Sequence, residues 1–168
     1  MECCDPAASV VDVHEAIADC PSCGARGKSV GEVTLHALLK PDCPRPDGPH
    51  RFCRSPACEV VYFAEADGAV MLGDALTVRV GAKETAADRP LCYCFGYTAA
   101  DVLEDVAATG TSEIPDRITE HCRRGEDRCP ETNPQGSCCL GNVRAVMREA
   151  QADAELRNAG GYAAGRPR

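Results

Sequence analysis

The sequence predicts an α+β fold of two small modules, a β-rich module braced by a metal ion followed by a helical module. Apolar β-forming residues gather between residues 60 and 80, whereas a helical periodicity begins after residue 91. The chain has 168 residues, no tryptophan and only 4% aromatic residues, so its apolar core is small. It also contains 13 cysteines, and bound metal commonly braces domains that lack core.

The strands of the first module are expected in the cysteine-free stretch 59–91. VVYFA (60–64) and AVML (69–72) have the composition of strands, and Asp67-Gly68 between them is typical of a hairpin turn. LTVRV (76–80) is expected to form a third strand. The polar segment KETAADRP (83–90), which ends in proline, is expected to link the two modules.

Three helices are expected after residue 91. Thr98 followed by Asp101 resembles a capping box and opens a helix that closes near Gly110. A second helix begins with Pro115 and stops at Gly125. The third runs from about Leu140 to Asn158, with its apolar stripe at Val143, Val146, Met147 and Ala150. A shorter helix is expected in VGEVTLHALL (30–39).

These elements divide the chain into four parts. Residues 1–17 are a flexible tail, 18–84 the metal-braced module, 85–158 the helical module, and 159–168 a disordered tail.

The cysteines indicate metal binding rather than disulfide bonds. Their number is odd, and the N-terminus has neither the basic start nor the apolar run of a signal peptide. A reducing cytoplasm is therefore expected. The net charge of -8 weighs against nucleic acid as a partner. No apolar stretch approaches the ~18 residues that would suggest a membrane span.

Four cysteines of the first module have the spacing of a structural zinc site. Cys20-Pro-Ser-Cys23 is one short loop with two thiols, and a second such loop runs from Cys53 to Cys58. Two loops of this kind supply the four thiolates of a closed, tetrahedral zinc site. The alternative, a redox dithiol at Cys20 and Cys23, does not account for the second pair. Cys43, in a proline-rich loop, is expected to be a spare thiol.

The cysteines of the second module suggest a [2Fe-2S] cluster. Cys92-Tyr93-Cys94 places two thiols on the same side of an extended chain, where they can hold one iron. The other two ligands must come from Cys122, Cys129, Cys138 and Cys139. We therefore expect a zinc-braced β-rich module followed by a helical [2Fe-2S] ferredoxin-like module.

The helical phase favours one of the two adjacent cysteines. Successive residues of a helix diverge by about 100°, so Cys138 and Cys139 cannot both face the cluster. Cys139 falls on the stripe of Val143 and Val146, whereas Cys138 falls off it. Cys129 is preferred to Cys122 because it enters an irregular loop, CPETNPQGS (129–137), that can fold over the cluster, whereas Cys122 lies within a predicted helix.

Four motifs in order resemble the N-terminal metal-binding domain of CopZ-type copper chaperones, a family of zinc and [2Fe-2S] metallochaperones. They are FCRSPACEVVYF, TVRVGAKE, CYCFGYT and TNPQGSCCLG, and the resemblance covers about residues 18–145. It implies zinc on Cys20, Cys23, Cys53 and Cys58. It implies a [2Fe-2S] cluster on Cys92, Cys94, Cys129 and Cys139.

The last segment also resembles bacterioferritin-associated ferredoxin. In that family a C-x-C pair is followed by C-x2-C before a helix; here Cys139 matches the first cysteine of the second pair and Asn142 replaces the other. Full-length CopZ proteins of this type add a heavy-metal-associated domain with an M-x-C-x-x-C motif. The sequence contains no such motif.

The function expected from these features is that of a metallochaperone accessory in copper or other soft-metal handling. The cluster would be a one-electron centre, for example reducing Cu(II), with Cu(I) held transiently and Cys3 and Cys4 able to capture a soft ion. The alternatives are a ferredoxin-like electron carrier for another redox partner and a zinc-braced protein-interaction module. Partners implied by the resemblance are a metal-transporting ATPase or a heavy-metal-associated domain protein. No enzymatic chemistry beyond metal reduction is expected, because the four histidines lack the spacing of a catalytic metal site.

Overall fold

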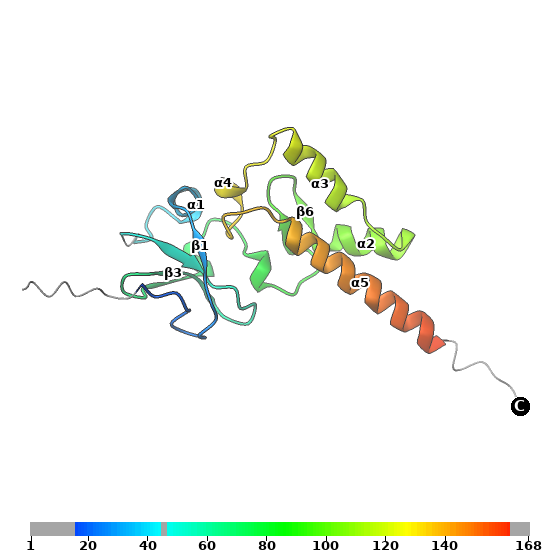
Figure 1. Cartoon of the computed structure of the whole chain (residues 1–168), viewed down its shortest axis with the longest axis horizontal. Coiled ribbons are helices and arrows are strands. Elements are labelled where there is room, and N and C mark those ends of the chain that lie inside the picture. Colours follow the sequence, from blue (N-terminus) through cyan, green and yellow to red (C-terminus); the bar gives the residue numbers. More distant parts are fainter. Residues whose placement is uncertain (1–15, 45–46, 162–168) are drawn as a thin grey trace, which may run out of the picture.

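The computed structural model describes residues 16–44 and 47–161 and has two parts, a β-sheet with one helix and a group of helices (Figure 1). The sheet is antiparallel and has the order β1-β2-β3-β4. Its elements are β1 (Lys28–Val30), α1 (Glu32–Leu38), β2 (His50–Phe52), β3 (Val60–Ala64) and β4 (Val70–Leu72). The predicted mixture of α and β elements is therefore confirmed.

The hairpin predicted around Asp67-Gly68 is present. β3 and β4 pair in antiparallel register, with Phe63 opposite Val70. The Asp67 carboxylate accepts a hydrogen bond from the Ala69 N–H at 2.9 Å, and Gly68 has the positive φ of 73° that such a turn requires. All five residues of β3 are buried, so this strand forms the centre of the first core.

The prediction of a strand at residues 76–80 is wrong. Gly73–Ala75 forms a short 3-10 helix, and Leu76 makes only an isolated bridge with Leu39. The Thr77 N–H donates to the Leu38 carbonyl at 2.8 Å. Leu76 and Val80 are buried, so these residues serve the core, but their backbone pairs with the chain that leaves α1 instead of with the sheet edge. The three-residue strands β1 and β2 were not predicted.

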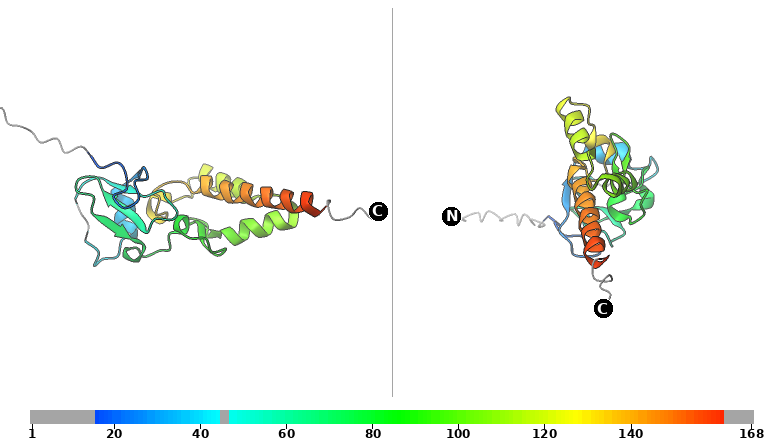
Figure 2. Two further views of the ribbon diagram at one scale, coloured as in Figure 1. Left: turned by 90° about the horizontal axis from the view of Figure 1, so that it is seen from below. Right: turned by 90° about the vertical axis from the view of Figure 1, so that its right-hand side faces the viewer.

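The second part begins with a small hairpin and continues with helices. Its elements are β5 (Pro90–Cys92), β6 (Tyr97–Thr98), α2 (Ala99–Thr109), α3 (Ile114–Arg123), α4 (Cys129–Thr132) and α5 (Leu140–Gly161). Figure 2 shows α2 running alongside α5. The core between these helices includes Val102, Ile118 and Val143, each at most 1% exposed.

The helix boundaries follow the sequence signals closely. Thr98 and Asp101 form the predicted capping box, with the Asp101 carboxylate accepting from the Thr98 N–H at 2.7 Å. Gly110 ends α2 in the left-handed conformation, and Pro115 lies in the first turn of α3. CPETNPQGS is less irregular than expected, because its first four residues form α4.

The segment 129–137 lies between the two parts and contacts the first (Figure 1). The Tyr62 hydroxyl of β3 donates to the Pro134 carbonyl at 2.7 Å, and the Thr34 hydroxyl of α1 donates to the Pro130 carbonyl at 2.6 Å. Lys28 of β1 also bonds Ser137. We refer to residues 129–137 as the docking segment. The expected module boundary at residues 84/85 stays a prediction.

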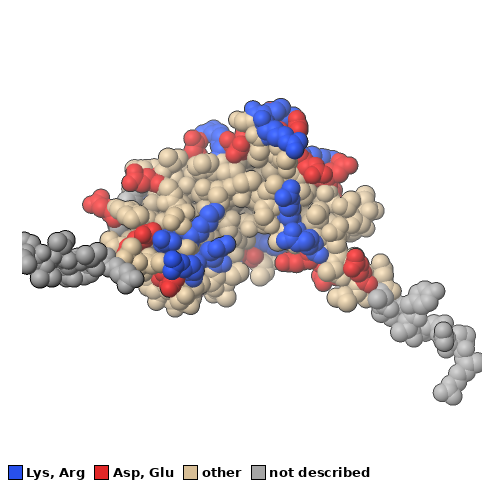
Figure 3. All heavy atoms as spheres, viewed as in Figure 1, with Lys and Arg blue, Asp and Glu red and all other residues tan. Residues whose placement is uncertain are grey.

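On the face shown in Figure 3, Lys and Arg side chains form several small clusters, and Asp and Glu side chains lie next to each of them. Among the described residues, Arg79 forms ion pairs with both Glu84 and Asp88. In the part of the chain that the structure describes, no helix combines the length and the apolar character needed to cross a membrane.

Candidate metal centres

The four cysteines predicted to bind zinc converge at one end of the sheet. Cys20 and Cys23 lie in a tight turn, in which the Gly24 N–H donates to the Cys20 carbonyl at 2.8 Å. Gly24 has a positive φ of 71°, which closes the turn. Cys53 follows β2 and Cys58 precedes β3, so the hairpin formed by these strands fixes the second loop.

The spacing of the four sulfur atoms fits a tetrahedral ion. All four Sγ atoms lie within 4.8 Å of one another. Sγ of Cys20 is 3.9 Å from Sγ of Cys58, and Sγ of Cys23 is 3.6 Å from Sγ of Cys53. Zinc–sulfur bonds of ~2.3 Å in a regular tetrahedron place the sulfurs ~3.8 Å apart. The set therefore forms a metal site that matches zinc in donor type, number and spacing.

The thiols of this site differ in acidity. The backbone N–H of Ala25 lowers the pKa of Cys23 to about 7, with the neighbouring thiols helping. Burial raises the pKa of Cys53 to about 12. Metal binding must therefore displace a proton from the Cys53 thiol, and this makes the affinity of the site pH-dependent.

The four cysteines predicted to bind the cluster also come together, but as two pairs. Sγ of Cys94 is 3.6 Å from Sγ of Cys129, at the start of α4. The thiols of Cys92 and Cys139 lie close enough that each shifts the pKa of the other. Cys94 thus lies next to Cys129, and Cys92 next to Cys139; the expectation that Cys92 and Cys94 hold one iron stays a prediction. The turn after β5 directs Cys94 to α4 and leaves Cys92 beside the residue that precedes α5.

Two thiol pairs fit a two-iron cluster, in which each iron binds two protein sulfurs. The 3.6 Å between Cys94 and Cys129 is close to the tetrahedral edge found in the first site. Cys92, Cys129 and Cys139 are at most 4% exposed, whereas Cys94 is half-buried. The donor set and its burial thus match a [2Fe-2S] group with one ligand near the surface.

Two groups that the sequence analysis missed bond to the Cys94 sulfur. The Arg128 N–H donates to this sulfur at 3.2 Å, and the Thr132 hydroxyl lies 3.2 Å from it. Arg128 directly precedes α4 and Thr132 is its last residue, and no sequence signal marks either as a partner of this sulfur. Hydrogen bonds to ligand sulfurs tune the reduction potential of iron–sulfur clusters.

The two thiols of the buried pair Cys92 and Cys139 differ in pKa. The hydrogen bond from the Cys139 thiol lowers the pKa of Cys92 to about 7. The same bond, together with burial, raises the pKa of Cys139 strongly. Burial likewise raises the pKa of Cys129. In the metal-free protein the first proton therefore leaves Cys92 readily and the second is held.

The other cysteines lie outside both sets. Cys43 is half-buried, and its thiol donates to the Pro44 carbonyl at 3.7 Å. Cys122 is half-buried in α3, and Cys138 is exposed just before α5. Cys3 and Cys4 lie outside the described residues. Asn142, which replaces a cysteine of the ferredoxin pattern, donates from its side chain to Gln135 at 2.7 Å.

Comparison with known proteins supports the first site. Residues 17–77 match a CopZ family whose description is "zinc binding domain". The X-ray structure of the Archaeoglobus fulgidus CopZ N-terminal domain is similar, with a TM-score of 0.62 and 32% identity over 76% of this chain and 96% of that one. The chain belongs to the family of CopZ-type N-terminal domains.

The match to full-length CopZ is partial. The copper chaperone CopZ of Archaeoglobus fulgidus is 34% identical over 122 residues, which cover 71% of this chain and 57% of that protein. The chain thus spans little more than half the length of this relative. The CopZ resemblance of the sequence is confirmed, and the similarity to bacterioferritin-associated ferredoxin stays a prediction.

Proposed function

We propose that this CopZ-type chain is a metallochaperone component that handles copper or another soft metal. In this proposal Cys20, Cys23, Cys53 and Cys58 hold a structural zinc ion. Cys92, Cys94, Cys129 and Cys139 hold a [2Fe-2S] cluster. The observation that carries the proposal is the arrangement of these last four cysteines in two close thiol pairs beside a complete four-thiol site.

The zinc site has the features of a structural centre. It consists of four thiols, so a bound zinc ion has no open position for a substrate. Three of the four cysteines are buried, and the chain passes through the site twice, before β1 and between β2 and β3. These cysteines therefore tie together segments that share few large apolar side chains.

The residues of the second site would supply a one-electron centre with a protected interior and one accessible edge. When bound there, a [2Fe-2S] cluster accepts and releases single electrons. Cys92 and Cys139 pack against Val143 and the rest of the helical core and exclude water. Cys94 is the most exposed of the four, and the Arg128 N–H and the Thr132 hydroxyl stabilise negative charge on its sulfur.

Copper as the handled metal is supported by the name of the CopZ relative and by the abundance of soft thiol ligands. A single electron from such a centre converts Cu(II) to Cu(I). A metal-transporting ATPase or a heavy-metal-associated domain protein is the partner that this role requires.

The test is anaerobic purification followed by metal analysis and titration with copper. We expect about one zinc and about two irons per chain, with the visible absorption of a [2Fe-2S] centre. The cluster is then reduced with dithionite, the excess is removed, and stoichiometric Cu(II) is added. The visible bands should return, whereas Zn(II), which has no redox chemistry, should not restore them.

Each alternative role has its own outcome. A colourless protein that contains zinc contradicts the proposal and identifies a zinc-braced interaction module. A brown protein whose cluster stays reduced after Cu(II) is added contradicts the copper role and favours a ferredoxin-like carrier for another redox partner.

A further inference from the structure

A cavity between α1 and the sheet lies apart from both candidate metal centres. Its volume is about 290 Å³, and its lining comes from α1, from the chain that leads into β2, from β2 itself and from β4. None of the cysteines assigned to the two centres lines it. The cavity therefore invites an explanation of its own.

The buried part of the lining is mostly apolar. Leu35 of α1, Leu39 just after it and Met71 of β4 line the cavity, and each is at most 6% exposed. All three belong to the main core of the sheet module, so this wall is firmly packed. An apolar cavity of ~150 Å³ is enough to hold benzene. The present cavity thus has room for one aromatic ring with a short chain.

One polar group lies in this buried part. His50 of β2 lines the cavity and is 2% exposed, and its Nδ1 is 2.8 Å from the Gly48 carbonyl oxygen. A carbonyl oxygen can only accept, so Nδ1 carries the proton and Nε2 of the neutral ring presents a lone pair. Nε2 is buried, and among the residues that the structure describes none bonds to it. A bound group that donates a hydrogen bond would satisfy this acceptor.

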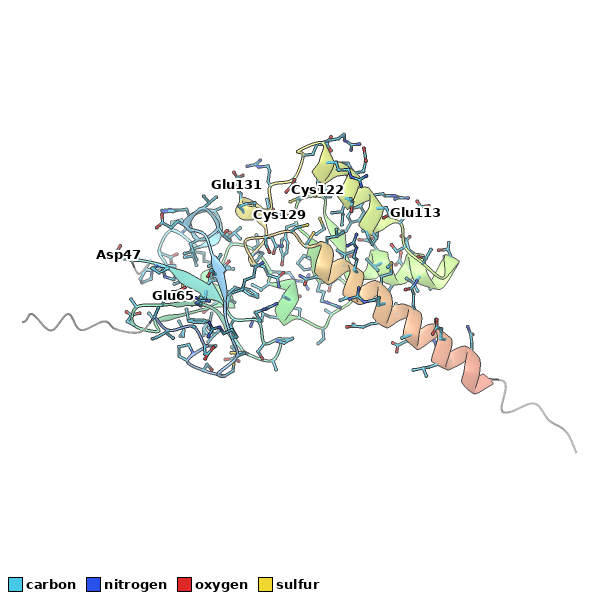
Figure 4. All side chains as sticks on the ribbon, in the orientation of Figure 1. Asp47, Glu65, Glu113, Cys122, Cys129 and Glu131 are labelled. Atoms are coloured by element: carbon cyan, nitrogen blue, oxygen red, sulfur yellow. The ribbon has the colours of Figure 1, made fainter. Side chains whose placement is uncertain are left out.

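The exposed part of the lining is acidic. Glu32, in the first turn of α1, and Asp47, which Figure 4 labels, are both exposed residues of the lining. His36 and Gly48 complete this mouth, and no described Lys or Arg lines the cavity. Two carboxylates at the opening attract a positively charged group. The cavity therefore combines a cation-attracting mouth, an apolar wall and one buried acceptor.

We propose that this cavity binds a small organic ammonium compound in which an aromatic ring separates the ammonium group from a hydroxyl group. The ring lies against Leu35 and Met71, the hydroxyl donates to Nε2 of His50, and the ammonium group faces Glu32 and Asp47. Binding is non-covalent, so no bond forms or breaks. This site goes beyond the proposed metal role and shares no residue with either metal centre.

The test compares three related probes by isothermal titration calorimetry with the full-length, metal-loaded chain, handled without air. Tyramine carries both polar groups, phenethylamine lacks the hydroxyl, and 4-ethylphenol lacks the ammonium group. We expect one tyramine to bind per chain. Phenethylamine should bind roughly two- to tenfold more weakly, the effect of one hydrogen bond. 4-Ethylphenol should lose up to about fivefold in affinity for each missing charge pair.

Two variants assign the contacts. In His50→Asn the side-chain amide can still donate to the Gly48 carbonyl, but nothing replaces Nε2, so tyramine and phenethylamine should bind equally. Glu32→Gln should weaken tyramine by up to about fivefold and leave 4-ethylphenol unchanged. Glu104→Gln makes the same change on an exposed residue of α2, outside the cavity, and should keep the parent affinities.

Four results would overturn the inference. They are no binding of tyramine to the parent chain, equal affinities for the three probes, a preference for tyramine over phenethylamine that persists in His50→Asn, and equal tyramine affinities of Glu32→Gln and Glu104→Gln. The last comparison stands even where His50→Asn fails to fold. Metal content and reoxidation by Cu(II) are measured separately, so failure here is distinct from failure of the proposed function.

Discussion

Adjacent cysteines have opposite environments at the start of α5. The Cys139 carbonyl accepts hydrogen bonds from the N–H groups of Asn142 and Val143, so this residue caps the helix and its side chain enters the core. Cys139 is 2% exposed, whereas Cys138 is exposed to solvent. The burial of each thiol is what the helical phase predicts, and the role of Cys139 as a ligand is our proposal.

The two cysteines therefore form a matched pair for mutation. Cys139→Ser should abolish the visible absorption and most of the bound iron, because an oxygen donor replaces a buried thiolate. Cys138→Ser should leave iron content and absorption unchanged. Iron analysis and visible spectra of the two variants, both purified without air, provide the measurement. Equal iron content in the two variants would contradict the proposed ligand set.

The element that connects the two parts of the molecule is the docking segment. Its backbone carbonyls accept hydrogen bonds from side chains of the sheet module, and Asn133 holds its turn by donating to the Ser137 carbonyl at 2.6 Å. Cys129 stands at its start and Cys139 just beyond its end. Two of the proposed cluster ligands are thus positioned by contacts with the other module.

Replacing Tyr62 with phenylalanine tests this arrangement. Tyr62 and Pro134 are both fully buried, so Tyr62→Phe leaves the Pro134 carbonyl without its partner, at a cost of ~1–3 kcal/mol. We expect a lower urea midpoint and faster loss of iron to a chelator. Thr77→Val likewise removes a hydroxyl that donates to a backbone carbonyl, that of Leu38, but within the sheet module, and it should release iron at the parent rate. Identical rates in the two variants would show that the segment is held by other contacts.

Local signals in the sequence identify most of the helices, but they do not predict that the docking segment contacts the sheet module. The capping box at Thr98, the proline at 115 and the glycine at 110 act through their own neighbours, so their effects are visible in the sequence. The hairpin at Asp67-Gly68 is local for the same reason. The formation of β1 and β2, and the absence of a strand at LTVRV (76–80), depend on pairing partners that are distant in sequence. The grouping of the cysteines was predictable from spacing, whereas the pairing of Cys92 with Cys139 depends on where the helices pack.

At the scale of the whole molecule, metal replaces the core that the composition cannot supply. Three cysteines of the four-cysteine site, Cys20, Cys53 and Cys58, pack with Val60 and Phe63 in a cluster separate from the main sheet core. Structural zinc contributes ~10–16 kcal/mol, which is comparable to the entire stability of a typical domain. The sheet module should therefore unfold when its metal is removed.

Zinc removal is expected to disrupt the second centre as well. A zinc chelator should reduce the far-UV signal of the sheet and, in parallel, bleach the visible bands, because the docking segment loses the surface of α1 and β3 on which it lies. Circular dichroism and absorbance during anaerobic chelator titration measure the two changes. Cys139→Ser, which lacks only a proposed iron ligand, should retain zinc and sheet structure. Visible bands that persist after all zinc has left would contradict this coupling.

The dependence of the docking segment on the sheet module sets an order of biosynthesis. If Cys129 and Cys139 reach their positions only after Tyr62 and Thr34 offer a folded surface, the proposed zinc ion must be bound before the proposed cluster is assembled. A newly made chain deprived of zinc would therefore stay colourless even where iron–sulfur assembly is intact. The brown colour expected of the fully loaded protein would then report the supply of both zinc and iron.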